Sequence, residues 1–545
     1  MTETPHTDHP TDRDSIPLPD EAATEDLGLR IGSELEPGDL VALHGPVGAG
    51  KTALARAILR ARLGDPELEA PSPTFTLMQS YDGPRGRVVH ADLYRIAGEG
   101  ELVELGLDEL QQDAAILVEW PERAPILLDR PRLDVYLSLD TATGDRSVSL
   151  AGAGALRARL DRARALEAMI AAAGWDDARR LPMSGDASSR LYQRLRRQDG
   201  ESAILMISPP RPDGPPVRRG KPYSAIARLA ESVHAFVAID RGLIAQGFSA
   251  PRIIAEDLEA GLLLIEDLGP GIVVDDDGPI PERYAEATRC LAALHAKSLP
   301  TSLAVERGRD YAIPPYDLDA MLIELDLLLD WYLPHVGGRE ASGSVRAEFG
   351  HAWREALQGP LAGPQTWTLR DYHSPNLIWL PEREGIDRIG IIDFQDAVLG
   401  PPAYDVASLL QDARVTVPPI LELKLLGAYA AARRAADPEF DMASFAAHYA
   451  IMAAQRATKI LGIFARLDRR DGKPAYLKHI PRIAAYLLRN LDHPALSRLR
   501  TWYAAALPDL FPPPPPPETE EPAAPGQEDA TPSADGAEPT AEPSR

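Results

Sequence analysis

A glycine-rich loop lies between an apolar strand and a helix in residues 38–59, GDLVALHGPVGAGKTALARAIL. The apolar residues 40–43 predict a short buried strand, and ALARAILRARL predicts a helix directly after the loop. The loop residues that fit the pattern GxxxxGK(S/T) without a mismatch are Gly45, Gly48, Gly50, Lys51 and Thr52. In this order, backbone N–H groups point at phosphate oxygens, Lys51 reaches the terminal phosphates and the Thr52 hydroxyl ligates Mg²⁺. The sequence therefore predicts a nucleotide site rather than a chance glycine turn.

An acidic residue follows a second apolar strand of the same unit. The uninterrupted apolar run 114–118 predicts a strand that stops at Glu119. Since the carboxyl ends of parallel strands meet at one edge of a sheet, Glu119 is a candidate carboxylate for the Mg²⁺ side of the nucleotide. Residues 134–150 predict two further strands joined at Thr-Gly-Asp. We expect a small α/β domain with a central, mostly parallel sheet.

Four motifs together resemble one known family. SPTFT (72–76) and HADLYR (90–95) stand between GPVGAGKT and VEWPE. In this order and spacing they closely resemble the TsaE family over about residues 27–140. TsaE is the ATPase subunit of the bacterial machinery that makes threonylcarbamoyladenosine at position 37 of tRNA. The resemblance implies TsaB- and TsaD-like subunits as partners, and tRNA as a partner only through that complex.

The same resemblance implies roles for individual residues. Lys51 and Thr52 would hold ATP and Mg²⁺, and Asp92 and Glu119 would serve the metal or the hydrolytic water. Thr74 would lie in a switch-like loop. For Asp92, a purely structural hydrogen bond at a strand end is the alternative.

A second set of motifs begins at residues 366–379, TWTLRDYHSPNLIW. Asp371 and Asn376 have the spacing of a kinase catalytic loop, in which a carboxylate accepts the hydroxyl proton and an amide oxygen binds Mg²⁺. His373 is predicted to brace the loop. An apolar strand then ends at Asp393, which is placed to be the second metal ligand. The ordered set predicts a two-lobed kinase-like α+β unit, with a small sheet-based lobe and a mainly helical lobe.

The upstream half of this unit fits the kinase pattern less well. Its candidate nucleotide-binding residues are Ser184, Gly185, Ser188 and Glu266, the last at a predicted strand and hinge. The strand that usually presents a phosphate-binding lysine presents Met206 instead. Lys221 is the nearest lysine downstream, and Glu231 is a possible partner glutamate. This difference leaves open a non-catalytic, pseudokinase-like binding module.

The second unit as a whole resembles the aminoglycoside phosphotransferase family over about residues 160–505. ILMISPP, LRDYHSPNLIWL and IIDFQDAVLGPPAYDVASLLQDAR resemble its branch of N-acetylmuramate/N-acetylglucosamine anomeric kinases, which also carries Met in this strand. The resemblance implies that ATP phosphorylates a sugar at the anomeric hydroxyl, in cell-wall precursor recycling. Asp405 either supports the loop or caps a helix. Candidates for sugar selectivity are Tyr449, Gln455, Arg456, Lys459 and Tyr476.

Composition limits the remaining possibilities. The 545 residues carry a net charge of −25, which argues against a protein that binds nucleic acid through its own basic surface. The single cysteine, Cys290, excludes an intrachain disulfide and a cysteine-based zinc site. No signal-like N-terminus and no run of eighteen apolar residues occurs, so we expect a cytoplasmic protein without a membrane span.

Pattern and composition divide the chain into parts. The ends, 1–26 and 512–545, are acidic and proline-bearing, and we expect both to be disordered. Between them we expect a TsaE-like ATPase domain at 27–150, a linker at 151–160 and a kinase domain at 161–511.

Three functions are compatible with these motifs. In the first, the chain is a bifunctional ATPase subunit and small-molecule kinase. In the second, it is an ATPase subunit fused to a non-catalytic module. In the third, the glycine loop is a regulatory switch and the kinase is the one high-turnover enzyme. The intact set Asp371, Asn376 and Asp393 favours the first over the second.

Overall fold

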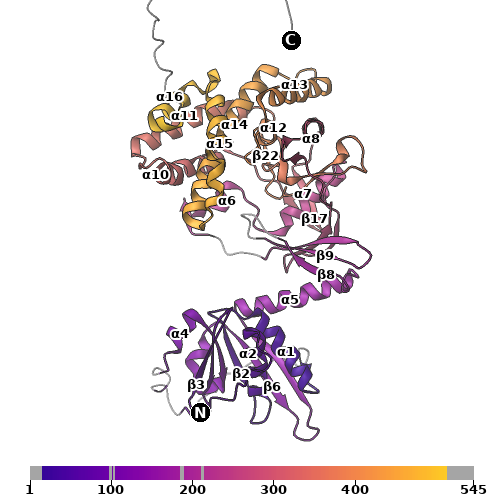
Figure 1. Cartoon of the computed structure of the whole chain (residues 1–545), viewed down its shortest axis with the longest axis vertical. Coiled ribbons are helices and arrows are strands. Elements are labelled where there is room, and N and C mark those ends of the chain that lie inside the picture. Colours follow the sequence, from indigo (N-terminus) through magenta and orange to yellow (C-terminus); the bar gives the residue numbers. More distant parts are fainter. Residues whose placement is uncertain (1–14, 97–100, 102–104, 184–189, 210–213, 512–545) are drawn as a thin grey trace, which may run out of the picture.

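The computed structural model describes residues 15–96, 101, 105–183, 190–209 and 214–511. Figure 1 shows two bodies with one long helix, α5 (Ala155–Ala172), between them. We call the described residues up to 153 the first body and those from 175 onward the second body. Within the described ranges, no helix has both the length and the apolarity that crossing a membrane requires.

The first body is a seven-stranded sheet with helices against it. Its elements are β1 (Ile16–Pro17), α1 (Glu21–Glu34), β2 (Leu40–His44), α2 (Lys51–Leu63), β3 (Met78–Gly83), β4 (Gly86–Asp92), α4 (Leu107–Asp113), β5 (Ala114–Glu119), β6 (Arg132–Leu139) and β7 (Arg146–Ala153). The strand order across the sheet is β1-β7-β6-β2-β5-β4-β3. Strands β6, β2, β5 and β4 run parallel.

The prediction of a mostly parallel sheet is wrong for the strands at the two edges of the sheet. β1 pairs antiparallel with β7, β7 with β6, and β3 with β4, so the sheet is mixed. For β6–β7 and β3–β4 the reason is the short connection, because a short hairpin joins only antiparallel strands, whereas a parallel pair needs a long crossover. β1 instead adds to the edge of the sheet from a distant part of the chain. The predicted strands around the glycine loop and before Glu119 are confirmed, and both lie in the parallel centre.

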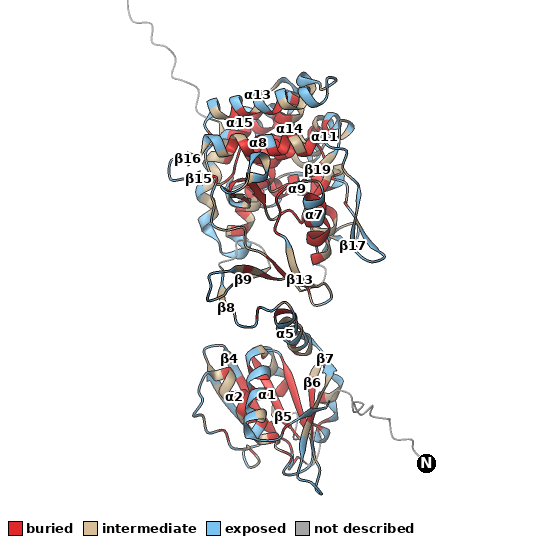
Figure 2. Ribbon diagram, turned by 90° about the vertical axis from the view of Figure 1, so that its right-hand side faces the viewer, coloured by how far each residue is buried: buried red, intermediate tan, exposed pale blue. Residues whose placement is uncertain are grey.

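The central strands are buried on both faces, as Figure 2 shows. Val41 of β2 belongs to the hydrophobic cluster under α1 and α2, and its neighbour Leu40 belongs to the cluster on the opposite face. Helices α1 and α2 approach closely, because a Cβ added at Gly28 would lie only 2.3 Å from the Cβ of Ala57. This packing fixes α2, and with it the glycine loop, over the strand ends.

The prediction of disorder for residues 1–26 is wrong for 15–26, which form β1 and the start of α1. Asp20 is the N-cap of α1, and its carboxylate accepts a hydrogen bond from the backbone N–H of Ala23 (2.8 Å). Acidic residues at this position stabilise a helix N-terminus, so the charge that suggests disorder serves as a cap here. Residues 1–14, like 512–545, lie outside the described residues.

The segment 151–160, expected to be a linker, forms the end of β7 and the start of α5. Leu156 is buried in the hydrophobic cluster of the first body. Arg159 donates to the backbone carbonyl of Glu34 (2.8 Å) and to the carboxylate of Asp39. These long-range contacts fix the start of the helix on the first body.

The other end of α5 belongs to the second body. Met169 and Ile170 lie in one hydrophobic cluster with Trp175 and with Leu205 on the back of the second body's sheet. An 18-residue helix has a length of roughly 27 Å, so α5 reaches from one core to the other. It is therefore a shared structural element.

Because α5 contributes to two cores, we expect Leu156→Ala and Ile170→Ala to destabilise different bodies. Removing such a buried aliphatic side chain costs about 2–5 kcal/mol. Hydrogen exchange should become faster in β6 and β7 for Leu156→Ala, and in the second body's strands β9 (Leu191–Arg196) and β10 (Ser202–Ile207) for Ile170→Ala. The exposed Arg164→Ala is the control. If α5 is only a tether, neither core variant changes exchange in either sheet.

The second body begins with a small lobe. Its elements are β8 (Arg179–Pro182), β9 (Leu191–Arg196), β10 (Ser202–Ile207), β11 (Pro216–Arg218), β12 (Lys221–Pro222), α6 (Tyr223–Ala227), α7 (Val233–Ala245), β13 (Ile253–Asp257) and β14 (Leu262–Glu266). Five of these strands form an antiparallel sheet in the order β13-β14-β10-β9-β8. Helix α7 packs on the face of this sheet opposite α5.

The rest of the second body is mainly helical, which confirms the predicted two-lobed arrangement (Figures 1 and 2). Its helices are α8 (Pro281–His295), α9 (Leu318–Leu327), α10 (Leu333–His335), α11 (Gly343–Ala362), α12 (Ala403–Leu410), α13 (Pro419–Ala436), α14 (Met442–Asp471), α15 (Ile480–Leu491) and α16 (Ser497–Ala506). Its strands are β15 (Val274–Asp275), β16 (Gly278–Pro279), β17 (Ser302–Glu306), β18 (Arg309–Ala312), β19 (Thr366–Thr368), β20 (Leu377–Trp379), β21 (Ile389–Ile391) and β22 (Val398–Gly400).

Candidate active sites

The glycine loop after β2 has a conformation that requires its glycines. Gly48 and Gly50 have φ values of 82° and 105°, a region that residues with a Cβ rarely adopt. At Gly45, an added Cβ would lie 2.4 Å from the carbonyl oxygen of Leu137 in β6. Helix α2 begins at Lys51, directly after the loop. The loop is therefore shaped by backbone requirements that only its glycines meet.

Lys51 lies folded over this loop. Its Nζ donates to the carbonyls of Gly45 (2.7 Å) and Pro46 (2.9 Å) and lies 3.6 Å from the centre of the Trp120 ring. Burial lowers the pKa of Lys51, and the nearby carboxylate of Glu119 opposes that shift. Its hydrogen-bond partners are neutral carbonyls, so an anionic oxygen placed in the loop would bind the ammonium more strongly than they do.

A hydroxyl and a carboxylate meet beside Lys51. The Thr52 hydroxyl donates to Glu119 Oε2 (3.0 Å), and the other carboxylate oxygen lies 3.0 Å from Nε2 of the buried His90. Trp120, the next residue, has a positive φ of 60°, a strained conformation of the kind that clusters at functional sites. Sequence reasoning missed His90 and Trp120 as partners, although both stand inside the motifs. The oxygen donors of Thr52 and Glu119 suit a hard cation such as Mg²⁺.

Asp92 lies at the end of β4, directly opposite Glu119 on β5. The hydroxyls of Ser72 and Thr74 both donate to its Oδ2, the latter at 2.7 Å. The backbone N–H of Tyr94 donates to Oδ1 (3.0 Å). Asp92 therefore forms the structural hydrogen bonds that were its alternative role, and through them it ties the loop of Thr74 to the strand end. That Asp92 acts on the metal or the hydrolytic water stays a prediction.

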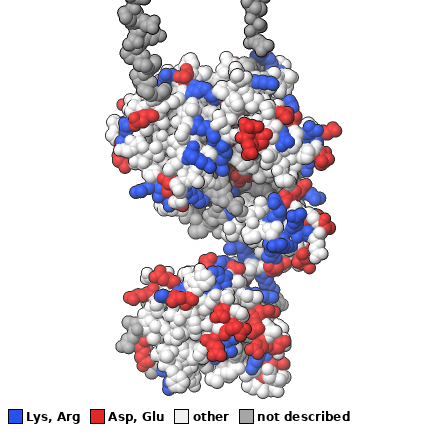
Figure 3. All heavy atoms as spheres, viewed as in Figure 1, with Lys and Arg blue, Asp and Glu red and all other residues white. Residues whose placement is uncertain are grey.

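Charge on the first body agrees with the sequence expectation. On the face shown in Figure 3, acidic side chains predominate over basic ones on this body, and the basic side chains are interspersed among them. This face offers no continuous basic surface of the kind that binds nucleic acid electrostatically.

A cavity of about 510 Å³ lies between the two lobes of the second body. The segment 267–269, which follows β14, contributes to its wall from the small lobe. Asp371, Asn376, Asp393 and Tyr476 contribute from the helical lobe. The cavity thus joins the predicted hinge to the predicted catalytic loop, and its volume is that of a small-molecule site.

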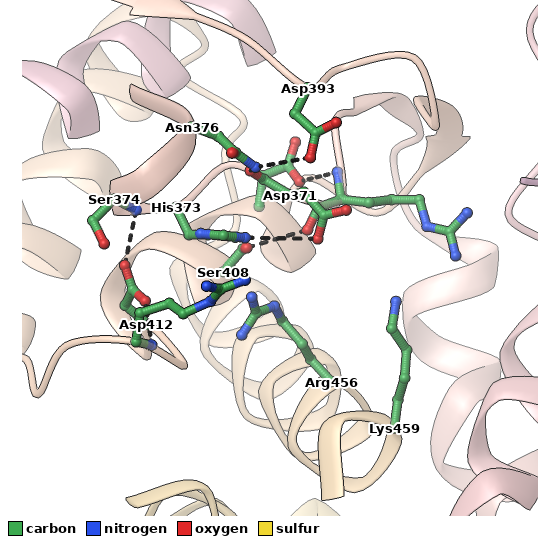
Figure 4. A network of polar contacts seen from close by, with 12 residues as sticks. Asp371, His373, Ser374, Asn376, Asp393, Ser408, Asp412, Arg456 and Lys459 are labelled. Atoms are coloured by element: carbon green, nitrogen blue, oxygen red, sulfur yellow. Dashed lines mark hydrogen bonds and ion pairs between the residues drawn. The ribbon is translucent and has the colours of Figure 1, made fainter. Parts of the chain in front are cut away.

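The structure brings together the three polar residues that the sequence predicted for this site (Figure 4). The Asn376 amide donates to the backbone carbonyl of Asp371 (3.0 Å) and to Asp393 Oδ2 (3.3 Å). Gln395 donates to Asp393 Oδ1 (2.8 Å). Arg370 and Asp393 both have positive φ values, of 69° and 60°. Such strain persists only where the surrounding structure holds it in place.

Two buried carboxylates hold the loop around Asp371. Asp405 accepts hydrogen bonds from the backbone N–H groups of Leu369 (2.6 Å) and Arg370 (2.9 Å). Asp405 therefore supports the loop rather than capping a helix, and burial raises its pKa to about 7. Asp412 accepts a hydrogen bond from the backbone N–H of Ser374 (2.8 Å). The catalytic loop is thus fixed on both sides of Asp371.

The electrostatic surroundings keep Asp371 ionised. Burial acts to raise its pKa, but the positive charges of His373, Lys459 and Arg370 outweigh burial and lower the pKa. Lys459 and Arg370 are charged throughout the neutral range. His373 Nε2 lies 3.9 Å from Asp371 Oδ1, and burial lowers the pKa of this imidazole. Asp371 is therefore a carboxylate at neutral pH, as a proton acceptor must be.

At the hinge, Glu266 and Asp267 are both held by arginines. Glu266 accepts a hydrogen bond from the backbone N–H of Arg252 (3.1 Å), and its carboxylate lies 3.6 Å from the guanidinium of Arg383. Asp267 pairs with Arg194 (2.7 Å). Both carboxylates lie at the cavity wall. The nucleotide role of Glu266 stays a prediction.

The remaining sequence candidates lie elsewhere or outside the described residues. Those outside are Ser184, Gly185 and Ser188. Met206 is fully buried in the core of the second body. Lys221 is exposed on the β11–β12 ribbon, and Glu231 is exposed ahead of α7. Neither replaces the expected lysine–glutamate pair, because neither lies on the strand or the helix that would present it.

One of the five selectivity candidates lines the cavity, namely Tyr476. Gln455 and Lys459 hydrogen-bond instead to the buried carboxylate of Glu324 (3.1 and 3.2 Å). Tyr449 and Arg456 make buried polar contacts elsewhere in the helical lobe. Most of the candidates therefore stabilise the lobe.

The burial of Asp240 on α7 leads us to expect that the free energy of unfolding depends on pH in a specific way. It is fully buried, and both carboxylate oxygens have no hydrogen-bond partner among the described residues. Burial raises its pKa to about 8. Since the unfolded chain loses this proton near pH 4, the wild type loses stability relative to Asp240→Asn as the pH rises from about 4 to about 8.

We expect the free energy of unfolding of Asp240→Asn, relative to that of the wild type, to rise by about 4 kcal/mol between pH 5 and pH 8. The change therefore favours the variant at the higher pH. Urea unfolding of both proteins at the two pH values measures this difference. A difference that is the same at both pH values would show that Asp240 is ionised in the folded protein.

Comparisons with known proteins divide the chain in the same way. The family model of the threonylcarbamoyl adenosine biosynthesis protein TsaE matches residues 18–148, and that of the phosphotransferase enzyme family matches residues 179–448. An N-acetylmuramate/N-acetylglucosamine kinase of Caulobacter vibrioides is 40% identical over 363 residues, which cover 64% of this chain and 97% of that protein. The kinase of the same name from Pseudomonas aeruginosa is 32% identical, over 59% of this chain and 87% of its own length. A tRNA threonylcarbamoyladenosine biosynthesis protein TsaE of Rickettsia bellii is 36% identical over 122 residues, or 22% of this chain and 84% of that protein.

Proposed function

Because the chain belongs to the TsaE family over its first body and to the N-acetylmuramate/N-acetylglucosamine kinase family over its second, we propose that it is a bifunctional ATP-using enzyme. The first body acts with TsaB- and TsaD-like subunits in making threonylcarbamoyladenosine at position 37 of tRNA. The second phosphorylates an amino sugar at its anomeric hydroxyl, a step of cell-wall precursor recycling. Contact with tRNA comes through the complex.

In the first body, the glycine loop and Lys51 bind the phosphates of ATP. Thr52 and Glu119 hold the accompanying Mg²⁺, whose charge offsets that of the phosphates. The 3.0 Å contact between the Thr52 hydroxyl and the Glu119 carboxylate supports this assignment, because it gathers two oxygen donors beside the lysine. Asp92 couples this edge of the sheet to the loop of Thr74.

In the second body, Asp371 accepts the proton of the sugar hydroxyl as that oxygen attacks the terminal phosphorus of ATP. The new O–P bond forms while the bond to the bridging oxygen breaks, and ADP leaves. Asn376 and Asp393 would hold Mg²⁺, which neutralises charge on the phosphates. Burial and the neighbouring Asp371 raise the pKa of Asp393, so a cation would relieve the repulsion between the two carboxylates.

The observation that carries the kinase proposal is the contact of Asn376 with both Asp371 and Asp393. A non-catalytic binding module has no need of a base and two metal ligands held in one strained, braced loop. Relatives that are named as kinases point the same way. We therefore favour the enzyme over the pseudokinase-like module.

The kinase proposal is tested with the full chain, ATP, Mg²⁺ and a panel of acceptors. The panel contains N-acetylmuramate, N-acetylglucosamine and an aminoglycoside, and ³¹P NMR identifies the oxygen that receives the phosphate. We expect transfer to the two acetylated sugars at the anomeric oxygen and none to the aminoglycoside. Transfer to none of the three would contradict the kinase proposal and leave the first body's assignment untouched.

The proposal for the first body is tested by reconstitution. TsaB- and TsaD-like proteins of the same organism are combined with the chain, ATP, threonine, bicarbonate and unmodified tRNA. We expect modification of the tRNA to require the chain. Equal modification with and without it would contradict the assignment.

A further inference from the structure

Among the described residues of the small lobe, strand β10 presents Met206 at the position where kinases present a lysine. Met206 occupies the lysine position of β10 and is fully buried, with Phe236 of α7 in the same cluster. Phe236 also lines the cavity. An apolar side chain, Met206, thus stands where kinases place the lysine that holds the phosphates. The positive charge for the ATP phosphates must come from another residue.

Two cations that line the cavity are placed for other tasks. Arg194 pairs with Asp267 (2.7 Å) at the hinge, where the base rather than the phosphates of ATP would lie. Arg414 lines the cavity from the helical lobe, and its guanidinium lies 5.7 Å from the centre of the Tyr476 ring. Neither lies beside the predicted metal carboxylate.

Arg190 does lie there. Its Nη1 is 3.8 Å from Asp393 Oδ1, and its side chain is only 14% exposed. It directly precedes β9, and Tyr192, two residues further along the chain, lines the cavity. A guanidinium thus lies next to the carboxylate that lines the cavity and would bind the metal of Mg·ATP.

We propose that Arg190 binds the terminal phosphates of ATP in the kinase body and takes the place of the strand lysine. This inference rests on the proposed kinase function. When Asp393 turns to the metal, the guanidinium exchanges a carboxylate for phosphate oxygens, which it binds with two parallel hydrogen bonds. Met206 can then pack in the core of the second body, because the residue that directly precedes β9 supplies the cation.

The test measures nucleotide affinity in the full chain carrying Lys51→Ala, so that the first body's site does not contribute. Titration calorimetry gives dissociation constants for Mg·ATP and for adenosine. Arg190→Ala should weaken Mg·ATP binding about 10- to 100-fold, as expected for lost charged hydrogen bonds, and change adenosine binding less than twofold. Arg190→Lys should recover part of the loss. Arg196→Ala, exposed at the other end of β9, is the matched control.

Two results would overturn the proposal. If Arg190→Ala and Arg196→Ala bind Mg·ATP equally well, Arg190 does not contact the phosphates. If Arg190→Ala weakens adenosine as much as Mg·ATP, its role is to hold the lobe together. Because no sugar enters this experiment, its outcome is separate from that of the acceptor panel.

Discussion

Replacing Asp371 by asparagine is expected to lower kcat for sugar phosphorylation by a factor of about 10²–10⁴ while leaving Mg·ATP affinity nearly unchanged. Asparagine has the same shape but accepts no proton. The backbone carbonyl of Asp371 receives the Asn376 hydrogen bond, and Asp405 holds the preceding backbone N–H groups, so the substitution leaves the loop in place. A coupled assay of ADP release gives kcat, and calorimetry gives the affinity.

Asp387→Asn is the matched control, since Asp387 is exposed in the turn before β21. It should keep wild-type kcat. Should Asp371→Asn retain more than a tenth of wild-type kcat, another group takes the hydroxyl proton and the assigned role of Asp371 is wrong.

Replacing Lys51 by alanine is expected to lower ATP hydrolysis by the first body at least 100-fold, measured with the TsaB- and TsaD-like partners present. The loss follows from the removal of a buried ammonium whose neutral carbonyl partners would yield to phosphate oxygens. Sugar phosphorylation should be unaffected, because the second cavity lies in the other body. Phosphate release and sugar phosphorylation are measured on the same sample.

Arg30→Ala, on the exposed side of α1, is the control for Lys51→Ala and should hydrolyse ATP at the wild-type rate. Unchanged hydrolysis in Lys51→Ala would mean that the glycine loop does not bind the reacting phosphates.

The spacing of residues within short motifs predicted the site residues whose partners lie close to them in the sequence. Lys51 and Thr52 followed from the loop pattern, and Asp371, Asn376 and Asp393 from the order of a kinase loop and a strand end. The structure gathers each set in one place. Such short motifs are readable because the backbone itself, through strand ends and tight turns, fixes where the side chains stand.

The residues that support these sets from a distance were harder to foresee. His90 reaches Glu119 across two neighbouring strands, and Asp412 reaches the catalytic loop from beyond α12. The sequence pattern around these two residues gave only a weak indication of their roles. His90 stands two residues before Asp92, a spacing that places both on one face of β4. Asp412 stands two residues after the end of α12, where no such periodicity applies. Without the partner strand or loop, a spacing does not identify what a side chain touches.

The two segments that were wrongly predicted to be disordered or a linker have a common physical cause for their order. Residues 15–26 and 151–160 are small, acidic or proline-bearing, and locally they resemble flexible chain. Long-range contacts order both, through the pairing of β1 with β7 and through Arg159 on the first body. Local composition carries no information on such contacts, so tertiary structure overrides it.

The central claim is that one chain carries two separate ATP sites that serve two reactions. The most direct test measures tRNA modification and sugar phosphorylation in parallel for wild type, Lys51→Ala and Asp371→Asn. We predict that Lys51→Ala loses only tRNA modification and that Asp371→Asn loses only sugar phosphorylation. If either variant loses both activities, or if Asp371→Asn still phosphorylates the sugar at the wild-type rate, the account of two separate sites is contradicted.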